Sequence, residues 1–228
     1  MGDGRDRLLD AAERLIAVDG VAGVSLRQIA SEAGQGNVSA VQYHFGSKEG
    51  LVDAILYRRM RPIDDERKAM VRALADDAPL ADLVDALVLP YAKAVTANTT
   101  MARFMAQALG DPSDDPFGRD SPPQLDGYRT VMRRINEAII AVPRPERLER
   151  LRLLRTLVVG ATADRELALA SRRRGTPSQK VFLGCLRDAA TAIVAGNTPP
   201  WALGQRELDG ATNAPAVRRK KQATSSSA

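Results

Sequence analysis

The sequence is short of cysteine and histidine, and these shortages exclude several kinds of site. Cys185 is the only cysteine and His44 the only histidine among 228 residues. One cysteine cannot form an internal disulfide or a multi-cysteine metal site. A glycine-rich phosphate loop and a His/Glu metal motif are also missing, so only Asp and Glu pairs remain as candidate catalysts. We therefore expect no metal, no cofactor and no enzyme activity.

Long hydrophobic runs are missing as well. No apolar stretch approaches the roughly 18 residues of a membrane span. The chain has Asp3 and Asp6 among its first residues, where a secretory signal has a basic segment followed by an apolar one. These features predict a protein of the cytoplasm with no membrane partner.

Aromatic residues make up only 4% of the chain, although hydrophobic residues make up 44%. Ala and Leu are abundant, and the alternating runs of Val, Ile and Thr that are typical of strands are nearly absent. The apolar residues must therefore be packed by helices, and we expect an all-α fold. The length allows one large domain or two small ones.

The net charge of +5 invites a nucleic-acid interpretation, but the location of the charge weakens it. Residues 1–50 are slightly acidic, and much of the positive excess lies in the basic run 218–221. This run belongs to residues 197–228, where Pro, Gly, Ser, Thr and charge replace any periodicity and predict a disordered tail. Composition alone therefore does not indicate DNA.

The first two helices are marked by periodicity and by caps. Apolar residues at three- and four-residue spacing predict a helix over residues 5–18 that ends at Gly20. Ser25 and Gln28 have the spacing of a capping box, in which each side chain bonds the backbone of the other. They predict a second, short helix that Gly34 ends.

A third and a fourth helix follow. Asn37 is a good N-cap for the third, and Ser47 caps a fourth that runs toward Pro62. Helical spacing turns three residues of the third helix toward the core, and these are Val38, Val41 and Phe45. The opposite face of the third helix then consists of Ser39, Ala40, Gln42, Tyr43 and His44.

A helix-turn-helix consists of two short helices that are joined by a Gly-containing turn and supported by another helix. The second of the two exposes a polar face that can enter a groove of DNA. Residues from about 25 to 45 fit this plan. The Gln42 amide can form hydrogen bonds with adenine, and the Ser39 hydroxyl can bond a base or a phosphate. The Tyr43 hydroxyl can bond a phosphate, and the Ala40 methyl group can contact the methyl group of thymine. Lys48 lies in the first turn of the fourth helix, where free amides already favour a phosphate.

These segments resemble the TetR family of transcriptional regulators over about the first 60 residues. The resemblance rests on Leu9-Asp10-Ala11-Ala12-Glu13-Arg14-Leu15, on Gly20, on Ser25-Leu26-Arg27-Gln28-Ile29-Ala30, on Ala33-Gly34, and above all on Tyr43-His44-Phe45-Gly46-Ser47-Lys48-Glu49-Gly50-Leu51. Two features depart from the commonest family pattern: the segment from Gly34 to Phe45 is one residue longer, and Gln42 stands where an aromatic residue is frequent.

The resemblance implies a homodimer that binds a palindromic DNA operator and releases it when a small ligand binds. Repression is the habit of the family, and activation stays open. The residues that the resemblance places against DNA are Arg27, Gln28, Ser39, Ala40, Gln42, Tyr43, His44 and Lys48.

The domain organisation that we expect is a DNA-binding domain over residues 1–50, a connecting helix over 51–62, and a larger helical ligand-binding and dimerisation domain over 63–196. Longer amphipathic helices divided by Pro and Gly are expected in this larger domain. They cover about 63–76, 80–97 with a kink at Pro90, 99–109, 124–141, a long helix after Pro145, and 178–195, with a surface loop over 110–123.

Met and aromatic residues recur on the central helices of this larger domain. They suit an ordinary core and the wall of an apolar ligand pocket equally well, because flexible Met side chains serve both. The candidate pocket residues are Tyr91, Met101, Phe104, Met105, Tyr128 and Met132.

Two apolar stripes near the C-terminus predict a two-fold, four-helix dimer interface, because a single subunit would struggle to cover both. The first stripe contains Leu151, Leu154, Val158 and Ala161, and the second Phe182, Cys185, Leu186, Ala189 and Ile193. The arginines within 144–155 and 172–174 are read as solvated helix faces.

Two other classes of function stay open. The larger helical domain could be an enzyme that the N-terminal module only targets, although no catalytic set supports this, or the protein could be a helical adaptor that binds other proteins. A salt-dependent gel shift on the promoter of its own gene would separate the regulator from both alternatives.

Overall fold

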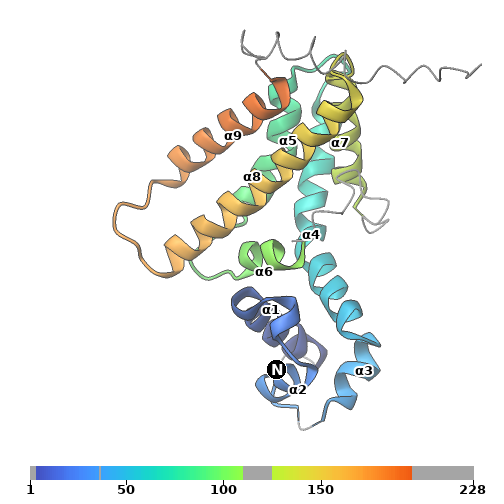
Figure 1. The fold of residues 1–228 in the computed structure, drawn as a ribbon, viewed down its shortest axis with the longest axis vertical. Helices are drawn as coiled ribbons and strands as arrows, with labels where there is room; N and C mark the ends of the chain where they lie inside the picture. The colour runs from blue at the N-terminus through green and yellow to red at the C-terminus, as the bar shows by residue number, and fades with distance from the viewer. Residues whose placement is uncertain (1–3, 36, 110–124, 197–228) are drawn as a thin grey trace, which may run out of the picture. The chain divides into compact units, whose positions relative to one another are not determined.

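The computed structural model describes residues 4–35, 37–109 and 125–196, and these residues form α-helices joined by turns (Figure 1). The helices are α1 (Gly4–Gly23), α2 (Leu26–Glu32), α3 (Ser39–Phe45), α4 (Lys48–Ala73), α5 (Leu80–Lys93), α6 (Met101–Ala108), α7 (Asp126–Ala138), α8 (Arg144–Ala170) and α9 (Gln179–Ala195). No strand occurs in these ranges, so the prediction of an all-α fold is confirmed there. No helix among them is long and apolar enough to cross a membrane.

The first three helices and the start of α4 share one apolar core, and we call this part the head. Leu8 and Ile16 of α1, Ile29 of α2, Val41 of α3 and Leu51 of α4 are all fully buried. Burial of a side chain of this size contributes about 1.5–3 kcal/mol. This shared core holds α3 in place against the other helices of the head.

The predicted ends of the first two helices are confirmed by glycine geometry. The helical backbone of α1 breaks at Gly20, where φ is 75° and ψ is 165°, and α1 resumes briefly to Gly23. The capping box of Ser25 and Gln28 is present, and Gly34 follows the C-cap of α2 with φ of 67°. Positive φ values of this kind favour glycine because it has no Cβ.

The prediction that a helix ends near Pro62 is wrong, because α4 continues through Pro62 from Lys48 to Ala73. The expected helices over 51–62 and 63–76 are therefore one helix. A proline inside a helix removes one hydrogen bond and costs about 3 kcal/mol. Met60 and Ile63 are buried on either side of Pro62, so packing of both halves of α4 offsets this cost.

The helix predicted over 80–97 ends earlier, at Lys93, after passing through Pro90. The Thr99 hydroxyl accepts a hydrogen bond from the Thr96 amide (3.1 Å), and its single proton is shared between the Thr96 carbonyl (3.0 Å) and the Glu166 carboxylate (2.7 Å). These local bonds favour a turn over a further helical turn. Helix α7 is also shorter than expected, ending at Ala138. The loop predicted over 110–123 and the tail over 197–228 lie outside the described residues.

The other helices pack against one another, and we call this part the body. It consists of α4 beyond its first turns and of α5 to α9. Helix α4 packs against α5 and α7, α8 packs against α6 and α9, and α5 packs against α9. Helix α6 contacts both α1 of the head and α8 of the body (Figure 1). It therefore joins the two parts, as does α4, which runs through both.

Two buried glutamates fix α6 between the head and the body. Glu13 of α1 is 1% exposed and accepts hydrogen bonds from Arg59 Nε (2.7 Å), Arg58 Nη2 (3.3 Å) and the Thr100 hydroxyl (2.9 Å). Glu166 of α8 is fully buried and accepts from the amides of Ala102 (3.1 Å) and Arg103 (3.0 Å), from Arg103 Nε (3.2 Å) and from the Thr99 hydroxyl (2.7 Å). A carboxylate at the start of α6 also suits its positive dipole end.

The two apolar stripes predicted to face a partner lie largely inside the subunit. Leu151, Leu154, Val158 and Leu186 are 0%, 1%, 8% and 4% exposed in the single chain. The reason is that α8 packs on α6 and α9, while α9 packs on α5, so one chain covers them. These four side chains are covered within one chain, and their place in a dimer interface stays a prediction. From the same prediction, Cys185 and Ala189 are exposed, and Phe182, Ile193 and Ala161 are half-buried.

Candidate functional site

The polar face of α3 begins with a side-chain cap. Asn37 Oδ1 accepts hydrogen bonds from the Ser39 amide (2.9 Å) and the Ser39 hydroxyl (2.8 Å). The helix itself starts at Ser39 with Val38 at the N-cap position, one residue later than the sequence predicts. Asn37 still accepts a hydrogen bond from an amide of the first turn, which is the role of an N-cap residue.

The outward face of α3 presents three of the predicted residues to solvent. Ser39 and Gln42 are exposed, and Tyr43 is 86% exposed. A large aromatic residue with this exposure on a soluble helix is free to contact a partner. The hydroxyl of Tyr43 and the amide of Gln42 provide hydrogen-bonding groups along one short helix.

The two other residues predicted for this face lie deeper. Ala40 is half-buried and packs against the apolar core, so it does not stand with the exposed set. His44 is half-buried, and its ring lies edge-on to the Tyr43 ring at 5.1 Å between centroids and 5.9 Å from the Phe45 ring. A role for His44 in bracing the end of α3 fits these contacts better than exposure to a groove.

The corner between α3 and α4 places Lys48 at a helix N-terminus. Gly46 ends α3 with φ of 73°, and the Ser47 hydroxyl accepts a hydrogen bond from the Gly50 amide (3.1 Å) as the cap of α4. Lys48, half-buried, is the first residue of α4. Hydrogen bonds from its own backbone amide and from the Ser47 side chain lower the pKa of the Glu49 carboxyl, which indicates that this helix end favours negative charge.

Helix α2 offers less than predicted. Arg27 and Gln28 are both exposed. The Gln28 Oε1 atom, however, accepts hydrogen bonds from the Ser25 amide (2.8 Å) and the Ser25 hydroxyl (2.7 Å). Only its Nε2 group is left to donate to a phosphate, so Arg27 is the stronger candidate of the two.

Arg5 joins this surface, although no sequence pattern indicates it. Its guanidinium lies 5.2 Å from the centroid of the Phe45 ring, and the residue is exposed. This position brings a positive charge of α1 to the end of α3. Periodicity within the first helix could not find it, because the contact joins residues forty positions apart.

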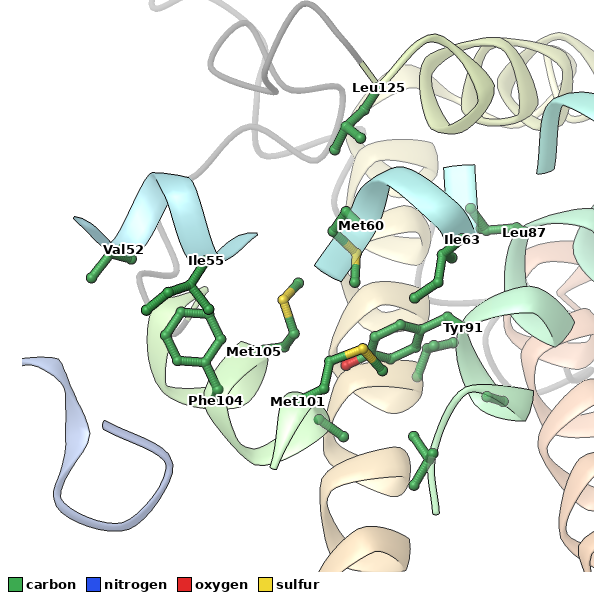
Figure 2. Close-up of a cluster of buried hydrophobic side chains, with 14 of the residues drawn as sticks. Val52, Ile55, Met60, Ile63, Leu87, Tyr91, Met101, Phe104, Met105 and Leu125 are labelled. Atoms are coloured by element: carbon green, nitrogen blue, oxygen red, sulfur yellow. The ribbon is translucent and has the colours of Figure 1, made fainter. Parts of the chain in front are cut away.

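The candidate pocket residues separate into groups. Tyr91, Met101 and Met105 are buried close together, with Met60 and Ile63 of α4 beside them (Figure 2). Phe104 is fully buried beside Ile55 instead (Figure 2). Tyr128 is half-buried with the Arg67 guanidinium 5.5 Å from its ring centroid, and Met132 of α7 is buried. All six residues belong to or pack against one core cluster, and a ligand pocket lined by them stays a prediction.

The comparisons with known proteins agree with this geometry. Residues 8–55 match the model of the bacterial regulatory proteins of the tetR family. A protein from Lactobacillus plantarum described as a transcription regulator is similar in structure, with a TM-score of 0.55 and 18% identity over 82% of this chain and 98% of its own. One from Shewanella sp. PV-4, described as a tetR family transcription regulator, has a TM-score of 0.50 and 17% identity over the same shares. Curated proteins gave no match.

Proposed function

The chain is a TetR-family transcriptional regulator, a DNA-binding protein, and from this we propose that it is a homodimeric repressor that leaves a palindromic operator when a small molecule binds its body. Residues 1–50 read the DNA, and residues 63–196 sense the ligand and dimerise. The observation that carries the proposal is the exposed polar face of α3 beside the N-terminus of α4. Such a regulator acts in the cytoplasm, where its DNA is, and has no catalytic role.

The residues of the head divide between reading bases and holding phosphates. Gln42 can form two hydrogen bonds with an adenine edge in the major groove. Tyr43 follows it on α3 and Lys48 begins α4, and both would bind phosphates, while Arg5 near Phe45 and the exposed Arg27 of α2 would add positive charge. Exposure supports this division, because Gln42 and Tyr43 extend from α3 into solvent.

The ligand response would act through α4. This helix starts at Lys48 beside the DNA and continues to Ala73 in the body. A dimer reads half-sites about one helical turn (~34 Å) or a multiple of it apart, so a small displacement of α4 would misalign the two α3 helices. A ligand that binds the DNA-incompetent state 100-fold better shifts the equilibrium by about 2.7 kcal/mol per site.

We expect two substitutions to separate the roles of the head in gel shifts. Lys48→Ala should weaken binding to all sequences and flatten the dependence of log K on log salt by about one unit. Gln42→Ala should reduce discrimination at one base pair by about 1–3 kcal/mol and leave the salt slope unchanged. The control is Lys93→Ala, which removes a lysine of α5 paired with Glu66 (3.6 Å). This variant should change neither the salt slope nor the discrimination between base pairs. Equal loss of sequence preference in both variants would contradict these roles.

The operator itself is tested with the promoter of the protein's own gene. The proposal expects a salt-dependent gel shift, a footprint with two-fold symmetry, and release by at least one metabolite of the enzymes encoded nearby. An enzyme or an adaptor would give no sequence-specific shift. Unchanged operator affinity across a broad panel of such metabolites would count against the ligand response.

We also propose a dimer through the faces of α8 and α9 that the single chain leaves uncovered. Leu153 and Leu167 are 48% and 46% exposed, and both lie seven residues from Gly160, where a Cβ would meet nothing within 4 Å. Residues seven apart share a helix face to within about 20°. On α9, Val181 is 54% exposed and Cys185 follows it by one turn. Small residues between apolar ones allow a second pair of helices to approach closely.

Neighbouring leucines of α8 should therefore respond differently to a carboxylate. Leu153→Glu places the charge on the uncovered face and should give a folded monomer in sedimentation. Leu154→Glu buries an unpaired charge, because Leu154 is 1% exposed, and should unfold the subunit. Ile140→Glu, at a position that is 64% exposed after α7, should remain a dimer. A dimeric Leu153→Glu variant would rule out this face.

A further inference from the structure

Arg67 is a buried guanidinium that forms no ion pair with an acid among the described residues. The residue is 6% exposed in the middle of the body, on α4. Its Nε donates a hydrogen bond to the Leu87 carbonyl (3.1 Å), and its plane lies over the Tyr128 ring. Among the described residues it makes no other hydrogen bond and no ion pair. A guanidinium has five N–H donors, and the four on the terminal nitrogens of Arg67 have no partner among the described residues.

The acids nearest to Arg67 along α4 are already bound elsewhere. Asp64, 1% exposed, accepts hydrogen bonds from the amides of Gly127 (2.9 Å) and Tyr128 (2.6 Å) and pairs with Lys68 (3.3 Å). Glu66 pairs with a lysine of α5. Desolvation lowers the pKa of Arg67 from its usual range. A buried cation in this state gains from any anion that reaches it.

Tyr91 provides a second unused donor near Arg67. It lies on α5 one turn after Leu87, the residue whose carbonyl Arg67 bonds, and is 2% exposed. Its hydroxyl is buried and has no hydrogen-bond partner of good geometry among the described residues; the Thr162 hydroxyl lies nearby but gives its own proton to the Val158 carbonyl (2.7 Å). Burial raises the pKa of Tyr91 to about 12, so the hydroxyl keeps its proton at neutral pH and can donate.

The side chains around this polar pair are apolar and adaptable. Met60 and Ile63 precede Arg67 by about two turns and one turn on the same side of α4, and Figure 2 shows them with Tyr91, Met101 and Met105. Thioether side chains repack at low cost around ligands of different shape. The body therefore combines an apolar surrounding with a buried guanidinium and a buried hydroxyl whose donors are not all used by the described residues.

We propose that Arg67 and Tyr91 bind the carboxylate of an apolar monocarboxylic acid, whose hydrocarbon part lies among Met60, Met101 and Met105. This names the class of effector and rests on the ligand-responsive repressor proposed above. The planar fork of a guanidinium matches a carboxylate with two parallel hydrogen bonds. One buried cation balances a single negative charge. A phosphate ester has a charge of about −1.5 to −2, so part of its negative charge would stay unbalanced. An uncharged ligand would leave Arg67 unpaired.

The test measures binding to the full-length protein by calorimetry. The probes are decanoate and 4-phenylbutanoate, each with its primary amide, and decyl phosphate as the other anion. The wild type should bind each carboxylate at least about tenfold more tightly than its amide, as expected for hydrogen bonds to charged groups. Arg67→Met should reduce this ratio to about one, and Arg67→Lys should keep part of it. Tyr91→Phe should weaken the carboxylates by about threefold to tenfold and spare the amides.

Arg133→Met is the matched control, since Arg133 is an exposed arginine of α7 paired with Glu137 (3.0 Å), and it should keep the full preference. Amides that bind the wild type as tightly as the acids would overturn the proposal. So would an Arg67→Met variant that keeps the preference, or decyl phosphate binding more tightly than decanoate. If circular dichroism shows that Arg67→Met does not fold, two other measurements test the proposal. These are the ratio of carboxylate to amide affinity in the wild type and the carboxylate affinity of Tyr91→Phe.

Operator release is measured separately, so the two proposals can fail independently. Carboxylates that bind through Arg67 without changing operator affinity would contradict the ligand-responsive function and leave the site intact. Release caused only by uncharged metabolites, with no carboxylate bound, would contradict the site and leave the function intact.

Discussion

Gly50→Ala is expected to abolish specific operator binding. A Cβ built on Gly50 would lie 2.2 Å from the carbonyl oxygen of Phe45, at the end of α3. The Cβ is held rigidly by the backbone of α4, and the oxygen belongs to the backbone at the end of α3, so the two helices must move apart. Overpacking of this kind costs about 1–3 kcal/mol of stability. The displaced α3 should also lose at least two base-edge contacts, which corresponds to an affinity loss of about a hundredfold or more.

Gly23→Ala in the same head is the control for this substitution. Its Cβ would lie at an ordinary contact distance of 3.4 Å from the Asp19 side chain. Operator affinity, measured by fluorescence anisotropy, should be unchanged in Gly23→Ala and lost in Gly50→Ala, while both proteins stay dimeric. Wild-type affinity in Gly50→Ala would mean that the corner does not hold α3 in its reading position.

Glu166→Ala is expected to lower the free energy of unfolding by about 3 kcal/mol. The change removes the acceptor of the Ala102 and Arg103 amides, and Ala102 is fully buried. The Arg103 side chain is 21% exposed and can turn partly toward water, which keeps the loss below that of a fully buried ion pair. Glu166→Gln should cost less, because its remaining carbonyl oxygen can still accept.

Urea denaturation at one fixed protein concentration measures this loss, because dimerisation makes apparent stability depend on concentration. Glu149→Ala on the same helix removes an exposed partner of Arg152 and should change the free energy of unfolding by less than about 0.5 kcal/mol. Equal stability of the Glu149→Ala and Glu166→Ala variants would show that the start of α6 does not depend on Glu166.

Local signals in the sequence predicted the head well because caps act over a few residues. The bond between Ser25 and Gln28 and the break at Gly20 depend only on nearby backbone, and both are present. Pro62 misled the prediction because its local cost is opposed by the buried Met60 and Ile63, whose packing depends on α5 to α7. Propensity is a weak guide wherever tertiary packing decides.

Periodicity identified buried faces but not what covers them. Leu151, Leu154 and Val158 form an apolar stripe as predicted, yet other helices of the same chain cover it. Glu166 was not predicted as a buried residue, although the sequence contains a signal for it. It continues the same stripe at helical spacing after Val158 and Thr162. A charged residue inside an apolar stripe indicates a buried hydrogen-bonding role, while its partners, here 63 to 67 positions away, cannot be read from the sequence.

The joint around Glu13 limits how this regulator can be re-engineered. In a chimaera that attaches this head to another sensor body, the boundary cannot be placed after residue 50, because Arg58, Arg59 and Thr100 would come from the foreign sequence. Glu13, 1% exposed, would then be a buried carboxylate without its donors. These four residues form one transplantable unit, so a graft that carries them together keeps the joint, and a graft that divides them loses it.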